Sequence, residues 1–328
     1  MIEQILKNFY RIQIPLPRNP LKYLNSYVIK DRNRFLIIDT GMNREECLRP
    51  MLSGLEELKV DLNRTDFFIT HFHSDHLGLI GELAPEGSKI YFSEVEASIV
   101  ESAQKMDIKG RVNILKPIFR SHGFPEDEFV KAMKNHPGFR FRPKTQLHFS
   151  TLKDGQNLDI GEYGFTCIET PGHSPGHMCL YEPNKKILVS GDHILFDITP
   201  NITFWPELEN ALKFYMTSLD KVYALDVKIV LPGHRNIMTD HRKRIRELRE
   251  HHKKRLNEAV SALKEGSENA WEVAQHLSWE IKCPSWKLFP STQKWFAFGE
   301  TIAHLDFLEG EGRVMRREDN NRILFSLL

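Results

Sequence analysis

The sequence predicts an α/β fold in which two stacked β-sheets are covered by outer helices, an αββα sandwich. Three observations support it. Strand-like segments recur along the first 240 residues, helical segments lie between some of them, and strands give way to helices after residue 240. Layers of this kind form because each sheet must bury its apolar faces against another element. We therefore expect a large domain at 1–240 and an accessory domain at 241–328.

The strands are predicted where Tyr, Ile, Val and Phe cluster between polar or Pro-containing turns. These segments are residues 10–14, 26–30, 35–39, 66–70, 89–92, 156–160, 165–169, 178–182, 186–190 and 227–231. A helix is predicted at 44–58. Residues 94–142 break this rhythm, because their pattern is mostly helical with Pro and Gly punctuation, and they predict a helical insertion within the sandwich.

The accessory domain is predicted to be mostly helical. A charged helix is expected at 242–263 and a short helix at 270–277. A further helix is predicted from apolar residues spaced for one buried face, namely Trp295, Phe298, Ile302, Leu305 and Leu308. Residues 313–316 and 322–327 flank a polar turn and predict a β-hairpin. Three helices followed by a hairpin are the outline of a winged helix.

Composition and charge indicate an ordinary globular chain. It has 328 residues, 41% hydrophobic and 27% charged, and its formal net charge of +1 gives no global attraction to nucleic acid or anionic membranes. The four cysteines lack CxxC spacing, which favours reduced thiols. The start has no signal-peptide pattern, and no apolar run is long enough to span a membrane. We therefore expect a cytoplasmic protein without a membrane segment.

The densest chemical pattern is HFHSDH at residues 71–76, directly after the predicted strand at 66–70. Zinc and similar divalent metals prefer imidazole nitrogen together with carboxylate oxygen. Alternate residues of an extended chain face the same way, so His71 and His73 can reach one ion. Once the chain turns, Asp75 and His76 can reach a second. A solvated polar loop is the alternative, but four ligand-type residues after one strand favour a metal site.

This HxHxDH motif resembles that of the metallo-β-lactamase superfamily, and the likeness extends along roughly the first 240 residues. Other family motifs follow in the expected order: Asp39-Thr40-Gly41, TPGHSPGH at 170–177, Ser190-Gly191-Asp192 and Leu231-Pro232-Gly233-His234. The resemblance implies that 1–240 is a catalytic domain with the metallo-β-lactamase sandwich fold. It also implies that Asp39 supports the metal-binding loop.

The resemblance further implies a centre of two divalent metal ions, expected to be zinc, with manganese or iron as alternatives. The first ion would be bound by His71, His73 and His173, the second by Asp75, His76 and His234, and both by Asp192. The two ions would share a water or hydroxide and polarise the substrate. Asp75 would in addition be a catalytic group that orients this water or carries a proton. His177 and His193 are interpreted as neighbours of the ligands.

The superfamily covers β-lactams, thioesters, lactones, phosphodiesters and redox chemistry, so the fold alone does not select a substrate. His73 stands where flavo-diiron proteins carry Glu, and Arg235-Asn236 departs from the run that follows the last metal histidine of glyoxalase II. The C-terminal segment resembles that of β-lactamase-like proteins with an appended winged helix. That group includes a mitochondrial endoribonuclease and bacterial proteins similar to hydroxyacylglutathione hydrolase.

Two features bear on the choice of substrate. Basic residues at 241–246 and 251–255 could meet the phosphates of RNA or coenzyme A, or could form a solvated helix with neighbouring Glu residues. Apolar residues of the insertion and those after Asp192 could line the mouth of the site, or could pack in the core; they include Phe119, Phe196, Phe204 and Trp205. An apolar cap fits a small acyl substrate better than a polyanion.

We therefore expect hydrolysis of a small ester or thioester, acyl-CoA or acyl-glutathione-like. A metal-dependent endoribonuclease or phosphodiesterase, with nucleic acid as its partner, is the alternative, as is a lactonase or β-lactamase-like activity. The C-terminal segment could also serve a homodimer.

Overall fold

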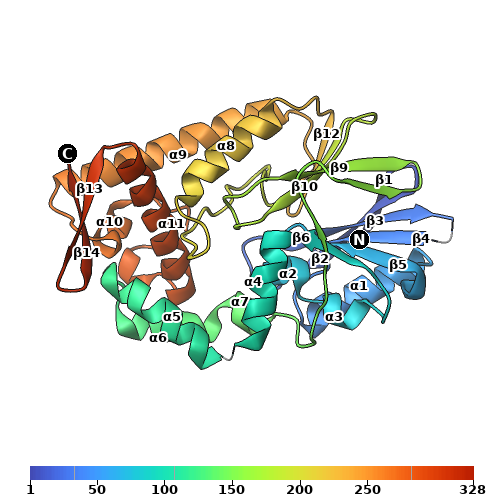
Figure 1. Cartoon of the computed structure of the whole chain (residues 1–328), viewed down its shortest axis with the longest axis horizontal. Helices are drawn as coiled ribbons and strands as arrows, with labels where there is room; N and C mark the ends of the chain where they lie inside the picture. Colours follow the sequence, from blue (N-terminus) through green and yellow to red (C-terminus); the bar gives the residue numbers. More distant parts are fainter. Residues whose placement is uncertain (33, 107, 282) are drawn as a thin grey trace.

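Two stacked β-sheets form one half of the molecule in the computed structural model, which describes residues 1–32, 34–106, 108–281 and 283–328 (Figure 1). The first sheet has the order β1-β2-β3-β4-β5-β6-β7. Its strands are β1 (Ile2–Leu6), β2 (Phe9–Pro15), β3 (Tyr23–Asp31), β4 (Arg34–Ile38), β5 (Thr65–Phe68), β6 (Ile90–Ser93) and β7 (Ser150–Leu152). The second sheet has the order β12-β11-β10-β9-β8. Its strands are β8 (Asn157–Ile160), β9 (Tyr163–Glu169), β10 (Met178–Glu182), β11 (Ile187–Gly191) and β12 (Ile229–Pro232).

Successive side chains of a strand point to opposite faces of the sheet. In the first sheet both faces are buried, each in a different core. Tyr27 and Ile29 of β3 pack between the two sheets, together with Phe165 of β9. Val28 lies on the other face, in the core beneath helix α1 (Glu45–Glu57), where Met51 packs. Helix α8 (Ala211–Tyr223) contributes to a third core, which also holds outward-facing residues of the second sheet. These layers confirm the predicted αββα sandwich.

All ten predicted strands are present, with ends that differ by a few residues. The prediction missed β1 and β7, the two edge strands of the first sheet. Both are short, and only Leu152 of their eight residues is buried, so the apolar pattern is weak. The predicted strand at 66–70 ends early, at Phe68. At Thr70 the backbone N–H donates to the Asp39 side chain, 2.9 Å away, instead of to a neighbouring strand.

The predicted insertion is helical but does not form a separate cap. Its helices are α4 (Glu94–Lys105), α5 (Ile108–Ser121), α6 (Glu126–Asn135) and α7 (Pro137–Arg140). Phe119 of α5 stacks on Trp295 with ring centroids 4.1 Å apart, and it also contacts Phe298. Both partners belong to helix α11 (Ser291–Gly310) near the C-terminus. The insertion and the C-terminal segment therefore share one core.

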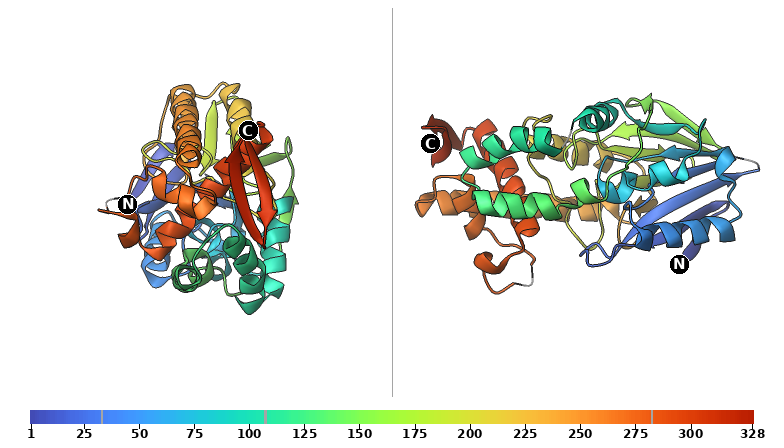
Figure 2. Two further views of the ribbon diagram at one scale, coloured as in Figure 1. Left: turned by 90° about the vertical axis from the view of Figure 1, so that its left-hand side faces the viewer. Right: turned by 90° about the horizontal axis from the view of Figure 1, so that it is seen from below.

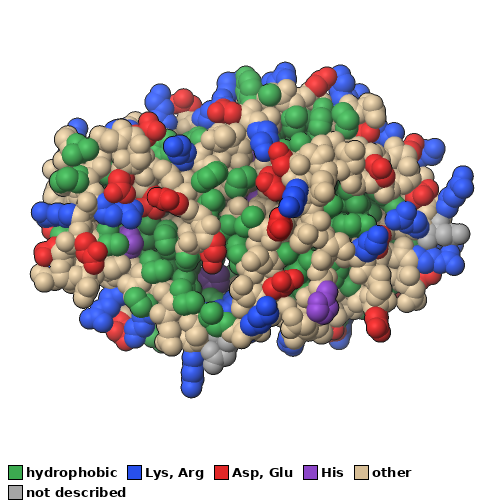
Figure 3. All heavy atoms as spheres, in the orientation of Figure 1, with side chains coloured by type: hydrophobic (Ala, Val, Ile, Leu, Met, Phe, Trp, Pro, Cys, Tyr) green, Lys and Arg blue, Asp and Glu red, His purple; other side chains and the backbone are tan. Residues whose placement is uncertain are grey.

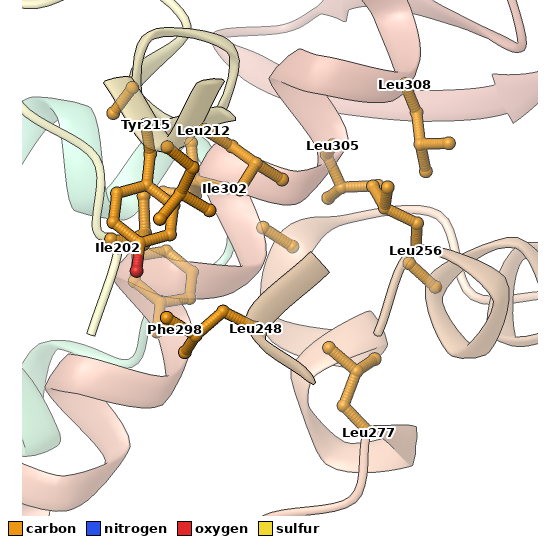
Figure 4. Close-up of a cluster of buried hydrophobic side chains, with 14 of the residues drawn as sticks. Ile202, Leu212, Tyr215, Leu248, Leu256, Leu277, Phe298, Ile302, Leu305 and Leu308 are labelled. Carbon is orange, nitrogen blue, oxygen red and sulfur yellow. The ribbon is translucent and has the colours of Figure 1, made fainter. Parts of the chain in front are cut away.

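We call this shared unit the helical lobe. It consists of α5, α6, α9 (His241–Lys264), α10 (Ala270–His276), α11 and the hairpin β13 (Val314–Asp319) and β14 (Arg322–Leu327). Figure 2 shows the lobe beside the sheets from two further directions, and Figure 4 shows part of its core. There Leu248, Leu256 and Leu277 lie near Ile302 and Leu305 of α11.

The C-terminal elements follow in the predicted order. In the hairpin, Asn320 and Asn321 take left-handed φ angles of 50° and 61°, which a tight two-residue turn requires and Asn tolerates. The hairpin is thus confirmed, whereas the winged-helix assignment and the domain boundary at residue 240 stay predictions. Among the helices that the structure describes, none has the length and apolar character needed to cross a bilayer.

Candidate metal centre

The predicted ligands meet because the strands that precede them end at the same edge of the two sheets. Strands β4, β5 and β6 are parallel, so the segments after them begin side by side. Strand β9 is antiparallel to β10, and β10 is antiparallel to β11, which is in turn parallel to β12. The segments that follow β9, β11 and β12 therefore also start at one edge. They carry His173, Asp192 and His234.

Within the HxHxDH stretch, a change from extended chain to helix turns the side chains in two directions. Strand β5 ends at Phe68, and helix α2 (Ser74–Leu77) has His73 at its N-cap. His71 and His73 thus precede the helix, while Asp75 and His76 lie in its first turn. The backbone oxygen of His76 accepts from both the N–H and the hydroxyl of Thr40, at 2.7 and 2.8 Å, which anchors this turn.

All seven predicted ligands lie in three adjoining groups. In each group the imidazole nitrogens and carboxylate oxygens are within 4.8 Å of one another. The groups are His71 with His73 and His173, His71 with His76 and Asp192, and Asp75 with His76 and His234. Because His71 and His76 each belong to two groups, the groups form one continuous cluster. Such a cluster of imidazoles and carboxylates can hold divalent metal ions.

Two of the imidazoles are oriented by backbone carbonyls. His173 Nδ1 lies 2.9 Å from the Asn201 carbonyl oxygen, and His234 Nδ1 lies 2.8 Å from that of Tyr23. A carbonyl oxygen only accepts, so each Nδ1 must carry the proton and donate it. In the neutral imidazole each Nε2 is then the unprotonated nitrogen, and this atom lies beside Asp192 in the cluster. A metal-binding histidine usually has this arrangement.

Asp39 supports the metal-binding loop, as the resemblance implied. Its backbone has a left-handed φ of 58°. Its carboxylate accepts from the Thr70 hydroxyl at 2.9 Å and lies 2.7 Å from His76 Nδ1. The Thr70 oxygen is in turn 3.0 Å from His71 Nδ1. One carboxylate therefore orients two predicted ligands, His76 directly and His71 through Thr70.

Asp192 lies between the two halves of the cluster. Its Oδ1 is 3.5 Å from His76 Nε2, and its Oδ2 is 3.7 Å from His173 Nε2 and 3.4 Å from His234 Nε2. The buried Oδ1 accepts no hydrogen bond from any residue that the structure describes. A buried, unpaired carboxylate oxygen is costly unless a positive charge compensates it. A divalent cation between these side chains would provide that charge, so the residues fit a metal centre.

The backbone at Gly233 lies very close to two of the predicted ligands, Asp192 and His76. A Cβ atom placed on Gly233 would lie 2.5 Å from Asp192 Oδ1 and 2.7 Å from the His76 ring. Those distances are far below ordinary van der Waals contact, and neither side chain can withdraw without leaving the cluster. The glycine before His234 therefore leaves the room in which the ligands meet.

In the group of His71, His73 and His173, two imidazoles are in the neutral form that a metal ion requires. Burial and the neighbouring imidazoles lower the pKa of His71 well below its usual range. Burial, followed by the charge of His173, lowers the pKa of His73 to about 3. Both imidazoles are therefore neutral near pH 7 and keep a lone pair for a metal.

Carboxylates give the group of Asp75, His76 and His234 a negative field. Burial alone would raise the pKa of Asp75, but the hydrogen bond from His234 and the charge of His76 lower it to about 2. Burial alone would lower the pKa of His234, but the charges of Asp192 and Asp75 raise it to about 9. The same negative field that holds a proton on His234 attracts a cation.

His177 and His193 stand apart from the three groups. His177 Nε2 accepts a hydrogen bond from the Asp192 backbone N–H at 3.1 Å, and its Nδ1 lies 2.8 Å from the Thr170 hydroxyl. His193 is buried with its ring against Tyr215, at a centroid distance of 5.4 Å. These positions agree with the prediction that both histidines are neighbours of the ligands.

Glu96, in the first turn of α4, is a functional residue that the sequence analysis missed. Its buried carboxylate accepts from the Phe72 N–H, the Ser174 hydroxyl and the Gly176 N–H, each at 2.7 Å. It thus joins the loop of His71 and His73 to the loop of His173. Burial raises its pKa to about 7, against the lowering effect of these hydrogen bonds. Its spacing of four residues from the buried Val100 places it on the inner helix face, a signal that could have revealed it.

Aromatic side chains border the cluster. The Trp205 ring lies 5.2 Å from Phe72 and 5.8 Å from His73 by ring centroids, and its Nε1 donates to the His173 carbonyl at 3.2 Å. Trp205 therefore borders the cluster, which favours the first of the two alternatives predicted for it. For Phe119 the alternative of core packing holds, because that ring is only 5% exposed and is enclosed in the helical lobe.

Most basic residues of α9 make contacts within the molecule. The Arg242 side chain donates to the carbonyls of Tyr223 and Leu225, and that of Arg244 donates to the carbonyls of Leu195 and Ile198. Further along the helix, Lys254 and Glu258 form an ion pair at 3.7 Å. These contacts favour the interpretation of α9 as a bracing helix over that of a phosphate-binding helix.

The chain is similar to known proteins along almost its whole length. A family model described as the metallo-beta-lactamase superfamily matches residues 21–234, and one described as metallo-beta-lactamase-like, C-terminal domain, matches residues 256–326. A probable metallo-hydrolase of Bacillus subtilis (strain 168) is 25% identical over 315 residues, which cover 92% of each chain.

Two further comparisons bear on activity and fold. An acyl-coenzyme A thioesterase of Homo sapiens is 27% identical over 224 residues, which cover 65% of this chain and 73% of that protein. The crystal structure of a metallo-beta-lactamase family protein from Thermus thermophilus superposes with a TM-score of 0.84 at 27% identity. That superposition covers 99% of this chain and 100% of the other.

Proposed function

The chain belongs to the metallo-β-lactamase superfamily, and we propose that it is a zinc-dependent hydrolase of small thioesters, with acyl-CoA or acyl-glutathione-like substrates. One observation carries the proposal: seven imidazole and carboxylate side chains adjoin at one edge of the two sheets. We assign His71, His73 and His173 to a first ion, Asp75, His76 and His234 to a second, and Asp192 to both.

Two zinc ions bound there would activate a water molecule as nucleophile and polarise the thioester carbonyl. The chain itself supplies the orientation of the groups around them. Asp39 holds His76, while the carbonyls of Asn201 and Tyr23 hold His173 and His234. Ligands fixed in this way lose little freedom on binding, which favours a defined geometry.

Asp75 is the carboxylate that we assign to proton transfer. Its residue is 8% exposed, against 4% for Asp192, so it is the more accessible of the two. With a pKa of about 2 it is ionised at neutral pH and can accept a hydrogen bond from the attacking water. It would then carry a proton to the leaving thiolate.

The surroundings of the site support an acyl substrate over a polyanion. Trp205 and Phe72 offer apolar surface next to His73, where an acyl chain can be bound. Most basic side chains of α9 already have partners, and Figure 3 shows Lys and Arg interspersed with Asp and Glu on the face drawn there. The likeness to a human acyl-coenzyme A thioesterase supports the same class of substrate.

Metal content and turnover test this proposal together. We expect close to two zinc ions per chain and metal-dependent hydrolysis of acyl-CoA or acyl-glutathione in a panel that also contains lactone, β-lactam and RNA substrates. Asp192→Ala should lose metal from both positions and abolish turnover, because the carboxylate serves both ions.

The adjacent His193→Ala is the matched control and should keep its metal, since His193 lies outside the three groups. Full zinc occupancy in Asp192→Ala would remove Asp192 from the bridge. Faster cleavage of RNA than of any thioester, lost with His71→Ala, would contradict the assigned substrate.

A further inference from the structure

Residues 200–205 connect the metal centre to the helical lobe. On one side, the Asn201 carbonyl accepts the hydrogen bond from His173 Nδ1 at 2.9 Å. On the other side, the Asn201 side-chain Nδ2 donates to Glu300 Oε2 of α11 at 2.7 Å. The same Nδ2 lies 3.5 Å from the Phe296 carbonyl oxygen, a much longer contact. Asn201 therefore joins a predicted metal ligand to one carboxylate of the C-terminal helix.

The contact between this segment and α11 is close and specific. The Phe204 N–H donates to the Gly299 carbonyl at 3.0 Å, although that carbonyl belongs to a helix. A Cβ atom on Gly299 would lie 2.0 Å from the Thr203 hydroxyl oxygen, so the Thr203 side chain fills the space beside Gly299 that a larger residue would need. The segment is thus held against α11 next to the Asn201–Glu300 hydrogen bond.

Glu300 is itself fixed by a partner from α9. Its residue is 7% exposed, and its Oε1 lies 3.9 Å from Arg255 Nη1. The Arg255 guanidinium is buried and stacks over Trp279, 4.0 Å from the ring centroid. A buried carboxylate needs such a countercharge, and the pairing leaves Glu300 Oε2 directed at Asn201.

We propose that Glu300 is a positioning residue of the metal centre: through Asn201 it holds His173 in the tautomer and orientation that direct Nε2 at the first ion. The proposal rests on the metal centre of the proposed function and not on its substrate. It gives the C-terminal segment a role in assembling the site, although none of the seven ligands assigned above belongs to that segment.

The expected size of the effect follows from how metal-bound histidines are oriented. Removing a group that orients a ligand typically weakens metal binding about 10- to 100-fold. Without the Glu300 carboxylate, the Asn201 side chain loses its 2.7 Å hydrogen bond, and the carbonyl that fixes His173 is free to shift. The first ion should be affected, because His173 belongs to that group alone.

Zinc binding to the full-length chain, measured by competition with a chromogenic chelator, tests the proposal without any substrate. We expect Glu300→Ala to weaken the binding of one zinc ion about 10- to 100-fold and to leave the other within about threefold. Glu300→Gln keeps an oxygen that accepts from Asn201, so its zinc affinity should stay within about threefold of the unmodified chain. Thr301→Val is the matched control, because its buried hydroxyl bonds only to Ala297 of the same helix.

Asn201→Ala provides a second route, since Asn201 is only half-buried and its side chain makes the same hydrogen bond. Its loss of zinc affinity should match that of Glu300→Ala, and the double variant should lose no more than either single variant. Equal affinity in Glu300→Ala and Thr301→Val, or additive losses in the double variant, would overturn the positioning role. An unmodified chain that binds no zinc would instead refute the metal centre itself.

Discussion

His173 is a residue whose chemistry depends on side chains far from it in the sequence. Its neighbours Gly172 and Ser174 belong to the TPGHSPGH motif, which the sequence analysis identified. Asn201 and Glu300, in contrast, lie about 30 and 130 positions further along the chain. Trp205, the aromatic neighbour of this loop, is likewise brought in by the fold, through its hydrogen bond to the His173 carbonyl. Its ring presents apolar surface where a bound acyl chain would lie under the proposed function.

Trp205→Ala should therefore change the preference for acyl chains. Loss of a partly buried aromatic surface of this kind is worth about 1.5 kcal/mol, so kcat/KM for a long acyl-CoA should fall roughly tenfold. For acetyl-CoA it should change much less, because the short chain does not reach the indole. Steady-state kinetics over a series of chain lengths measures this difference.

Phe119→Ala is the contrasting variant. Its ring is enclosed by Trp295, Phe298 and other lobe residues, so truncation should lower the free energy of unfolding by about 3–5 kcal/mol without altering the chain-length profile. A chain-length profile that shifts with Phe119→Ala and not with Trp205→Ala would contradict the assignment of the mouth.

At the scale of elements, helices α9 and α11 of the helical lobe meet through two buried histidines. His304 Nδ1 lies 2.7 Å from the Glu300 carbonyl oxygen, which only accepts, so Nδ1 carries the proton. His304 Nε2 must then accept from His252 Nδ1, 3.1 Å away. Both rings are neutral in this arrangement. Burial lowers the pKa of His304 to about 3 and that of His252 well below its usual range.

Acid should therefore destabilise the helical lobe. In the unfolded chain these histidines bind protons below a pH of about 6.5, but in the folded chain His304 does so only near pH 3. The unfolded state thus binds more protons between these values, and the free energy of unfolding falls as the pH falls. The cost is on the order of 2 kcal/mol for His304 at pH 5.

Thermal unfolding at pH 7, 6 and 5 tests this expectation. Replacing both partners, His252→Leu with His304→Leu, removes the pair without leaving one polar group unsatisfied, and it should flatten the dependence of the midpoint on pH. An equal slope in the double variant would place the acid sensitivity elsewhere, for example at the imidazoles of the metal centre.

Elements were predictable from the sequence to the extent that their patterns are local. The strands with long apolar runs and most of the helices were predicted, since periodicity needs only neighbouring residues. Helix α8 was not predicted, although one of its faces is buried. The edge strands β1 and β7 were missed because they are short and most of their residues are at least partly exposed, which leaves little apolar pattern. The seven candidate ligands were found because family motifs hold them. Glu96 and Glu300 were not, since each acts through contacts that only the folded chain creates.

At the scale of the whole molecule, the division at residue 240 separates parts that share a core. Phe119, Phe124 and Phe129 of the insertion pack with Trp295 and Phe298 of α11. Helix α9 extends the same core beneath α8. The two segments of the helical lobe thus depend on each other, although roughly 100 residues of sandwich sequence lie between them.

A chain that ends at residue 240 should consequently fail to form a stable monomer, even though it keeps every proposed ligand. Loss of the partners would expose the insertion's aromatic side chains, and apolar patches of that kind lead to aggregation. We expect most of the truncated protein to be insoluble, with the soluble remainder binding a hydrophobic dye. A monomeric truncate with the full chain's zinc content and unfolding midpoint would contradict the shared core.

The contact between Phe119 and Trp295 also has a consequence for synthesis of the chain. The two residues are separated by roughly 180 positions, which a ribosome needs on the order of 10 to 35 seconds to add. During that interval the insertion's aromatic residues have emerged, but their partners do not yet exist. The nascent chain must therefore keep them soluble by other means, and α5 and α6 are segments to which a chaperone that binds exposed aromatic side chains would bind.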